Sequence, residues 1–204
     1  MTHATLLPDN LEPAWDIARL FPPQGAWSEN EYLGLPGNHL SEFDHGRIEV
    51  LAMPTELHQL LVAMLYRALL GYVGPRNLGV VLFAPFPVKL WEGKLREPDV
   101  LFMRREHAER RRGSHWVGAD LVMEVLSPDD RRRDTEVKRR EYALAGIPEY
   151  WLVDPDGETV TVLIRDAGSG DYVEHGQFAH GEIATSPTLD GLTLAIDDLF
   201  SCQP

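Results

Sequence analysis

"EPDVLFM" (residues 97–103) and "ADLVMEVL" (residues 119–126) are the two stretches that decide the fold. Each is a run of apolar, strand-forming residues with an isolated carboxylate inside it, Asp99 in the first and Glu124 in the second. A carboxylate in such surroundings is costly to bury unless a partner supports its charge. The two stretches therefore predict neighbouring strands that carry a chemical site.

Alternation along the two strands gives each carboxylate a face, because successive side chains of a strand point to opposite sides. Glu124 falls on the same face as Val122 and Leu126, and Asp99 on the same face as Leu101 and Met103. On adjacent strands about 4.8 Å apart, the two carboxylates would converge at one edge of a sheet.

Two explanations account for a pair of converging acids. Like charges held close together repel, so one acid stays protonated unless a cation lies between them, and a hard divalent metal with oxygen ligands meets that need. The alternative is that each acid forms a salt bridge with one of the sixteen arginines, which is the commoner solution for a single buried acid.

Lysine is scarce in this chain, where only Lys89, Lys94 and Lys138 occur. Helical spacing places Asp134, Lys138 and Tyr142 on one stripe. An ammonium is a compact donor, whereas a guanidinium prefers two-pronged contacts. The functional interpretation has Lys138 reaching over the end of the Glu124 strand, and the alternative is an ordinary exposed Asp–Lys pair.

The rest of the chain predicts an α/β layered domain around a mixed sheet. The expected elements are a short helix from Ser28 with Glu31 as its capping partner, two strands around a turn at 44–46, a long amphipathic helix over 54–74, a helix over 134–145, and strands over 149–155, 158–166 and 171–175. Residues 1–26 show little periodicity and are expected to form a loosely packed extension before a domain at 27–204.

Charge is unevenly distributed. The net charge of -13 argues at first sight against a nucleic-acid partner, but residues 104–140 carry 11 Lys and Arg against 8 Asp and Glu. This segment is either a solvated, charge-laced helix and loop or a surface that grips phosphates. The arginines that would grip are Arg104, Arg105, Arg110, Arg111, Arg112, Arg131, Arg132 and Arg133.

The chain lacks the sequence marks of membrane insertion or export, because it has no uninterrupted apolar run of membrane-spanning length and no signal-like start. The single cysteine, Cys202, excludes a disulfide framework within the chain. We therefore expect a soluble cytoplasmic protein.

Several motifs together resemble the Uma-type restriction endonuclease family, which belongs to the PD-(D/E)XK nuclease superfamily. They span residues 27–200 in matching order and are "GRIEVLAMP", "HQ" at His58, "EPDVLF", "DLVMEVLSP", "RRRDTEVKRREYALAGIPEYWLVDP" and "SPTLDGLTLAIDDLF". The resemblance implies a restriction-endonuclease-like core, a mixed central sheet flanked by helices. It also implies hydrolysis of DNA phosphodiester bonds by an endonuclease that needs Mg²⁺, for which Mn²⁺ could substitute.

The resemblance assigns roles to individual residues. Asp99 corresponds to the Asp of the "PD" motif and Glu124 to the acid of the next strand, and both are expected metal ligands. The superfamily places a lysine two residues after the second acid, where this chain has Leu126, so Lys138 of the following helix is expected to serve instead. His58 and Glu49 are weaker candidates for the catalytic site. The alternatives are that His58 is a histidine on the helix surface and that Glu49 is an exposed strand acid.

Two other functions remain open. Leu126 at the lysine position and the charge of -13 are consistent with a catalytically inactive nuclease fold that serves as a binding module. A metal-dependent phosphoesterase acting on a smaller substrate is the other alternative. Cleavage of both strands of a duplex requires two active sites or a repositioning, so a homodimer is expected as the nuclease's assembly.

Overall fold

The computed structural model describes residues 21–35, 40–128 and 131–201. In the first half the elements are α2 (Glu29–Leu33), β1 (Ser41–Asp44), β2 (Arg47–Val50), α3 (Glu56–Arg76), β3 (Gly79–Phe83), β4 (Val88–Trp91), β5 (Lys94–Arg96) and β6 (Val100–Arg104). In the second half they are the 3₁₀ helix η1 (Arg105–Arg110), β7 (Trp116–Val117), β8 (Leu121–Val125), the π-helix η2 (Arg133–Lys138), α4 (Arg139–Leu144), β9 (Glu149–Asp154), β10 (Thr159–Arg165), β11 (Tyr172–Phe178), β12 (Ile183–Thr185), β13 (Thr193–Ala195) and α5 (Ile196–Phe200).

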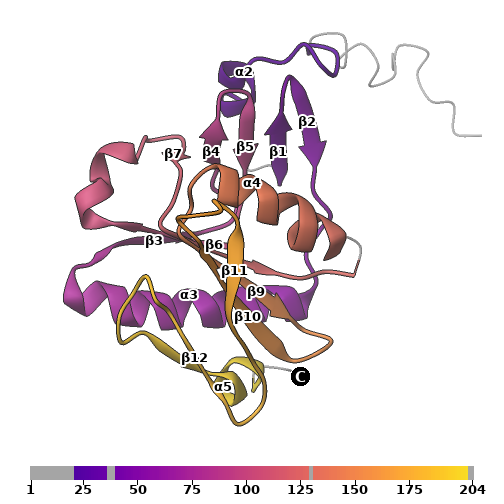
Figure 1. Ribbon diagram of the computed structural model, residues 1–204. Helices are drawn as coiled ribbons and strands as arrows, with labels where there is room; N and C mark the ends of the chain where they lie inside the picture. Colours follow the sequence, from indigo (N-terminus) through magenta and orange to yellow (C-terminus); the bar gives the residue numbers. More distant parts are fainter. Residues whose placement is uncertain (1–20, 36–39, 129–130, 202–204) are drawn as a thin grey trace, which may run out of the picture.

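The main sheet has six strands in the order β11-β10-β9-β8-β6-β3. Neighbouring strands in this sheet are antiparallel, except that β8 and β9 run parallel. The sheet is therefore mixed, as predicted. Helix α3 covers one face and α4 the other (Figure 1). The result is the predicted α/β layered architecture.

The alternation of β6 and β8 sorts their side chains between two buried clusters, one on each face of the main sheet. Leu121, Met123 and Val125 pack with α3, whereas Leu101, Met103, Val122 and Leu126 pack with α4. The predicted faces are therefore confirmed, and both carboxylates belong to the α4 side.

A second sheet of five strands, in the order β2-β1-β5-β4-β7, stands beside the main sheet (Figure 1). Its first hairpin turns at His45 and Gly46, both with positive φ, as the predicted turn at 44–46 requires. From β5 the chain passes through Glu97, Pro98 and Asp99 directly into β6. Asp99 therefore lies where the two sheets meet.

The helices agree with their sequence signals, with two differences. Ser28 and Glu31 form the expected capping box of α2. Helix α3 runs past the predicted end at 74 to Arg76, because Asn77 takes the left-handed conformation and closes it. The helix predicted over 134–145 begins with a π-helical turn, η2, instead of a regular α-helical one.

The prediction for the N-terminal extension concerns mostly residues 1–20, which lie outside the described residues. Of the remainder, Gln24 hydrogen-bonds both the backbone N–H and the carbonyl of Ile48, and Phe21 stacks on Trp27. These contacts attach residues 21–27 to β2.

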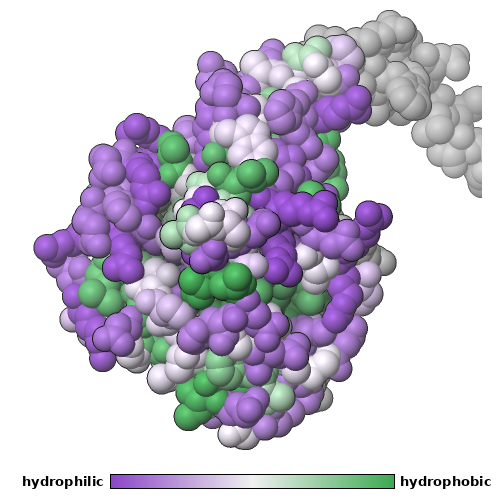
Figure 2. Space-filling view, viewed as in Figure 1, coloured by the Kyte–Doolittle hydropathy of each residue, from purple (hydrophilic) through white to green (hydrophobic). Residues whose placement is uncertain are grey.

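The surface is mostly hydrophilic on the face drawn in Figure 2, where apolar side chains form small groups. By length and composition, α3 is the one helix within the described ranges that could cross a membrane. A core helix of a soluble protein passes the same test, and α3 buries Leu61, Leu65 and Leu69 against the main sheet.

Candidate active site

Asp99 and Glu124 lie opposite each other at the ends of β6 and β8, two inner strands of the main sheet. The antiparallel register of β6 and β8 pairs Val100 with Met123, and one step further along it sets Asp99 across from Glu124. The backbone N–H of Val125 donates to Oδ2 of Asp99 at 2.8 Å, which fixes that carboxylate against β8. The structure thus brings the two predicted acids together.

Lys138 of η2 reaches the same point from the face of the main sheet that α4 covers. Its Nζ lies 2.9 Å from Oε1 of Glu124 and 3.1 Å from Oδ1 of Asp134. Lys138, Glu124 and Asp134 are all buried, so the alternative of an exposed Asp–Lys pair is wrong. The cation paired with Glu124 is this lysine, and no arginine within residues 21–35, 40–128 and 131–201 forms a salt bridge with Glu124.

The stripe of Asp134, Lys138 and Tyr142 faces the sheet as its spacing predicted. The Tyr142 hydroxyl donates to Oε1 of Glu124 at 2.6 Å, beside the Lys138 contact. Asp134 and Lys138 lie in the π-helical segment, whose wider turn is a local irregularity of the kind often found at functional sites. Glu124 therefore has two donors from one helix.

His58 joins the site from the first turn of α3. The side chain of Thr55 caps this helix by accepting the N–H of His58, which fixes the turn. His58 Nε2 then lies 3.2 Å from Oδ2 of Asp99. Burial by itself lowers the pKa of His58, but the hydrogen bond and charge of Asp99 outweigh it and raise the pKa above its usual value.

Glu49 does not touch Asp99, Glu124 or Lys138. It is half-buried and pairs with Arg96 and Arg133. The fully buried Glu42 is the residue opposite Glu49 in the register of the β1–β2 hairpin. It lies closer to the site, with its Oε1 3.7 Å from Lys138 Nζ. Sequence reasoning missed Glu42, because the hairpin register only sets it opposite Glu49 and does not show that β1 lies beside the site.

Burial and charge determine the protonation of the site. Burial acts to raise the pKa of Glu124, and the charges of Asp99 and Asp134 add to this effect, while the Lys138 ammonium and the hydrogen bond from Tyr142 oppose it. Burial would lower the pKa of Lys138, but Glu124, Glu42 and the two aspartates together hold it well above its usual value. The Lys138 ammonium therefore stays charged.

The site opens into a cleft of about 1110 Å³. Its polar end holds His58, Glu97, Asp99, Glu124, Arg133, Asp134 and Lys138. Nδ1 of His58 and Oε2 of Glu97 are buried there without a hydrogen-bond partner in the described part of the chain. Such atoms mark places where a water molecule or an ion completes the hydrogen bonding.

The donor set fits a magnesium ion. Asp99 and Glu124 supply carboxylate oxygens at one edge, and acids outnumber bases among the charged groups at the polar end of the cleft. Within residues 21–35, 40–128 and 131–201, no three His, Cys, Asp or Glu side chains form a group that could hold a metal unaided. Mg²⁺ does not need three, because it commonly keeps several waters and takes one or two protein carboxylates plus substrate phosphate.

The arginines expected to grip phosphates lie apart from the site or are already paired. Arg104 and Arg105 are at the opposite end of β6 from Asp99, about 16 Å away along the strand. Arg110 pairs with Asp120, and Arg131 with Asp154. Of this set, only Arg133 lines the cleft.

Comparisons with known proteins agree on one family and one fold. The model of the Uma2 family, described as "Putative restriction endonuclease", matches residues 29–197. No curated protein matches the chain. Among solved structures, the crystal structure of "a putative nuclease belonging to DUF820" from Anabaena variabilis is similar with a TM-score of 0.67. It is 22% identical, and the alignment covers 86% of this chain and 98% of that chain.

These matches confirm the restriction-endonuclease-like fold, with its mixed sheet between helices. They also confirm the resemblance read from the motifs, since the matched range takes in His58, Asp99, Glu124 and Lys138. The chain belongs to the Uma2 family of restriction-endonuclease-like nucleases.

Proposed function

We propose that the protein is a Mg²⁺-dependent endonuclease that hydrolyses phosphodiester bonds of DNA. The observation that carries the proposal is the opposition of Asp99 and Glu124 on adjacent strands, with the charged Lys138 buried against Glu124. The family description supports DNA as the substrate, because restriction endonucleases act on DNA.

Asp99 and Glu124 would hold the metal, with the backbone carbonyl of Val125 as a further ligand. When bound, Mg²⁺ lowers the pKa of a coordinated water and stabilises negative charge on the phosphate. Mn²⁺ is expected to substitute, since it takes the same oxygen donors.

Lys138 supplies positive charge to the reacting phosphate. Its ammonium donates to Oε1 of Glu124, while Oδ1 of Asp134 lies 3.1 Å away as an ion-pair partner without accepting a hydrogen bond. Donor capacity of the ammonium therefore remains for a phosphate oxygen or the attacking water. A fixed cation aimed at developing charge in a water-poor site stabilises the transition state more than it would in bulk water.

His58 and Val125 hold Asp99 in place. Both contact Oδ2 of Asp99, and no side chain or N–H in the described part of the chain donates a hydrogen bond to Oδ1, the oxygen that would be available to the metal. A ligand oriented by its neighbours binds without first losing rotamer freedom, and loss of such partners typically costs metal affinity tenfold or more.

The test is a cleavage assay with Mg²⁺ or Mn²⁺ on duplex DNA, single-stranded DNA and RNA. We expect Asp99→Asn and Glu124→Gln to abolish cleavage, and Lys138→Met to reduce it about a hundredfold. Asp197→Asn is the matched control, because Asp197 is an exposed carboxylate paired with His180 outside the cleft. Cleavage of DNA by folded Asp99→Asn and Glu124→Gln proteins would refute the assignment.

The same assay separates the alternatives. Binding of DNA without cleavage and without metal binding would identify an inactive binding module. Release of phosphate from mononucleotides, with DNA left intact, would identify a phosphoesterase. We also propose a homodimer for cleavage of both strands, which light scattering on the purified protein can measure.

A further inference from the structure

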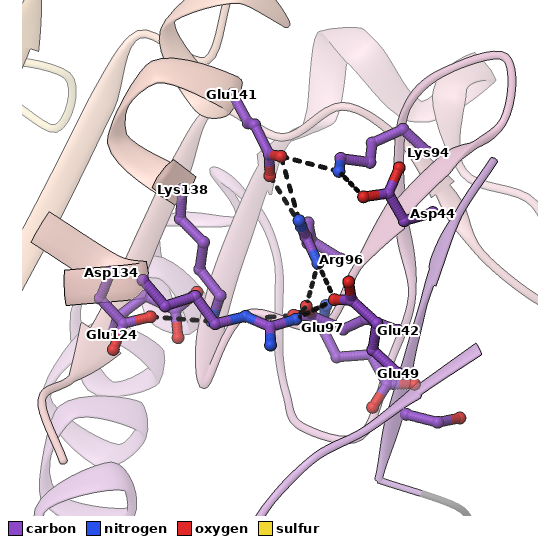
Figure 3. A network of polar contacts seen from close by, with 12 residues as sticks. Glu42, Asp44, Glu49, Lys94, Arg96, Glu97, Glu124, Asp134, Lys138 and Glu141 are labelled. Atoms are coloured by element: carbon purple, nitrogen blue, oxygen red, sulfur yellow. Dashed lines mark hydrogen bonds and ion pairs between the residues drawn. The ribbon is translucent and has the colours of Figure 1, made fainter. Parts of the chain in front are cut away.

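A buried network of charges connects the small sheet to the helix that carries Lys138 (Figure 3). Arg96 of β5 is at its centre, with a side chain that is only 3% exposed. Its Nε and one terminal nitrogen donate to the two oxygens of Glu141, at 2.7 and 3.0 Å. Its other terminal nitrogen donates to Glu42 at 2.5 Å and to Glu49 at 2.9 Å.

A second guanidinium closes the network at the other end of the helix. Arg133 donates to Glu42 and Glu49, the same two acids that Arg96 contacts. Arg133 precedes Lys138 by five residues and Glu141 follows it by three. The segment that carries Lys138 is therefore tied to β1 and β2 on one side of the lysine, and to β5 on the other.

Glu42 is the member of the network that approaches Lys138 itself. One of its oxygens accepts from the two arginines, while Oε1 accepts the N–H of Glu97 and lies 3.7 Å from Lys138 Nζ. Burial acts to raise the pKa of Glu42, but Lys138, Arg96 and Arg133 outweigh it and lower the pKa to about 2. Glu42 therefore faces Lys138 as a fixed negative charge.

The location of Lys138 gives a reason for such a network. A lysine at position 126 would be placed by the main sheet, whereas Lys138 lies on a helix that could shift relative to β8. Buried ion pairs add little net stability compared with apolar packing, because desolvation offsets their attraction. A network this extensive is better explained by the geometry that it imposes.

We propose that Glu42 and Arg96 are positioning residues that hold the Lys138 ammonium beside Glu124. Arg96 fixes Glu42 and Glu141, and through them the height and rotation of the helix over the strand end. The expected effect on the cleavage rate rests on the proposed nuclease function, whereas the expected effect on the position of Lys138 does not.

The experiment compares Glu42→Gln with Glu29→Gln in the full-length protein. Glu29 is a matched control, because it is a part-buried glutamate paired with Lys89 at 2.6 Å, away from the cleft. The chain has only three lysines, so a ¹⁵N-lysine NMR spectrum contains three side-chain signals, and the loss of one in Lys138→Arg assigns Lys138.

For Glu42→Gln we expect a shifted Lys138 signal with faster ammonium proton exchange, and a kcat for DNA cleavage lowered about tenfold at unchanged KM. Glu29→Gln should shift only the Lys89 signal and keep kcat. Glu42→Asp, which retains the charge, should recover part of kcat. Glu141→Gln cuts the same network at the helix end and should act in the same direction, which keeps the test decisive if Glu42→Gln does not fold.

A folded Glu42→Gln protein with an unchanged Lys138 signal and unchanged kcat would overturn the positioning role. If the wild type cleaves no nucleic acid but the Lys138 signal still moves in Glu42→Gln, the proposed function fails while the positioning role holds.

Discussion

At the residue scale, the unusual group is Glu124, a buried acid held by two donors from the same helix. Lys138 and Tyr142 both contact its Oε1. A hydrogen bond to a charged acceptor contributes roughly twice as much as a neutral one. The two contacts therefore fix the rotamer of the carboxylate that is proposed to bind the metal.

The Tyr142 contact gives a stability prediction. We expect Tyr142→Phe to reduce the free energy of unfolding by about 2 kcal/mol, because the buried Glu124 loses a hydrogen-bond donor. Tyr172→Phe is the matched control, since its buried hydroxyl donates at 2.8 Å to the neutral carbonyl of Ile147, and should cost about 1 kcal/mol. Urea unfolding of the two variants measures both values. An equal or smaller loss for Tyr142→Phe would show that the Glu124 contact is not charge-assisted.

The lowered pKa of Glu42 gives a pH dependence. A carboxyl whose pKa falls from 4.5 in the unfolded chain to about 2 in the folded protein contributes stability above pH 4.5, and this stability is lost as the pH falls toward 2. The stability advantage of wild type over Glu42→Gln should therefore shrink by about 2 kcal/mol between about pH 6 and about pH 3. Urea midpoints across this range measure it, and a constant difference would contradict the shift.

At the element scale, the site depends on a strand pair and on the helix that crosses its end. The side-chain period of a strand is a local property, so the faces of Asp99 and Glu124 could be predicted from neighbouring residues alone. The stripe through Lys138 could be predicted in the same way. The π-helical start of that helix could not, because no local pattern distinguishes residues 133–138 from a regular α-helical turn.

Moving the lysine from position 138 on the helix to position 126 at the end of β8 tests whether it can act from either element. Leu126 lies on the same face as Glu124, is packed under α4 and lines the cleft. In the double variant Leu126→Lys, Lys138→Met, the net charge is unchanged and an ammonium returns beside Glu124. We expect cleavage at least about tenfold above that of Lys138→Met alone.

The control for this exchange is Leu126→Met, Lys138→Met, which fills the same space without a charge. Cleavage assays on folded proteins compare the three variants. If the variant Leu126→Lys, Lys138→Met cleaves DNA no faster than Lys138→Met, the lysine must be on the helix for activity.

At the scale of the whole molecule, the site lies where two sheets meet. Asp99 follows β5 of the small sheet and begins β6 of the main sheet, and Glu42 reaches the site from β1. The sequence did not reveal this junction, because the pairing of β1 with β5 joins residues about fifty positions apart and leaves no local pattern. Glu42 was missed for this reason, and the arginine-rich segment was expected near a site that most of its side chains do not reach.

Metal binding by the folded protein predicts a thermal shift. A ligand at a hundred times its dissociation constant stabilises the native state by about 2.7 kcal/mol, which corresponds to a rise in Tm of about 5 to 10 °C for a chain of this size. We expect this rise with Mg²⁺ for wild type and for Asp197→Asn, but not for Asp99→Asn. A rise of the same size in Asp99→Asn would place the bound metal elsewhere.

Asp99 and Glu124 are proposed to hold a divalent metal. Anomalous X-ray diffraction from a crystal soaked in Mn²⁺ tests it most directly, because it locates the ion without reference to activity. We predict an anomalous peak in contact with both carboxylates, next to the Lys138 ammonium. Saturating Mn²⁺ with peaks only at other places, and an intact pair between Glu124 and Lys138, would contradict it.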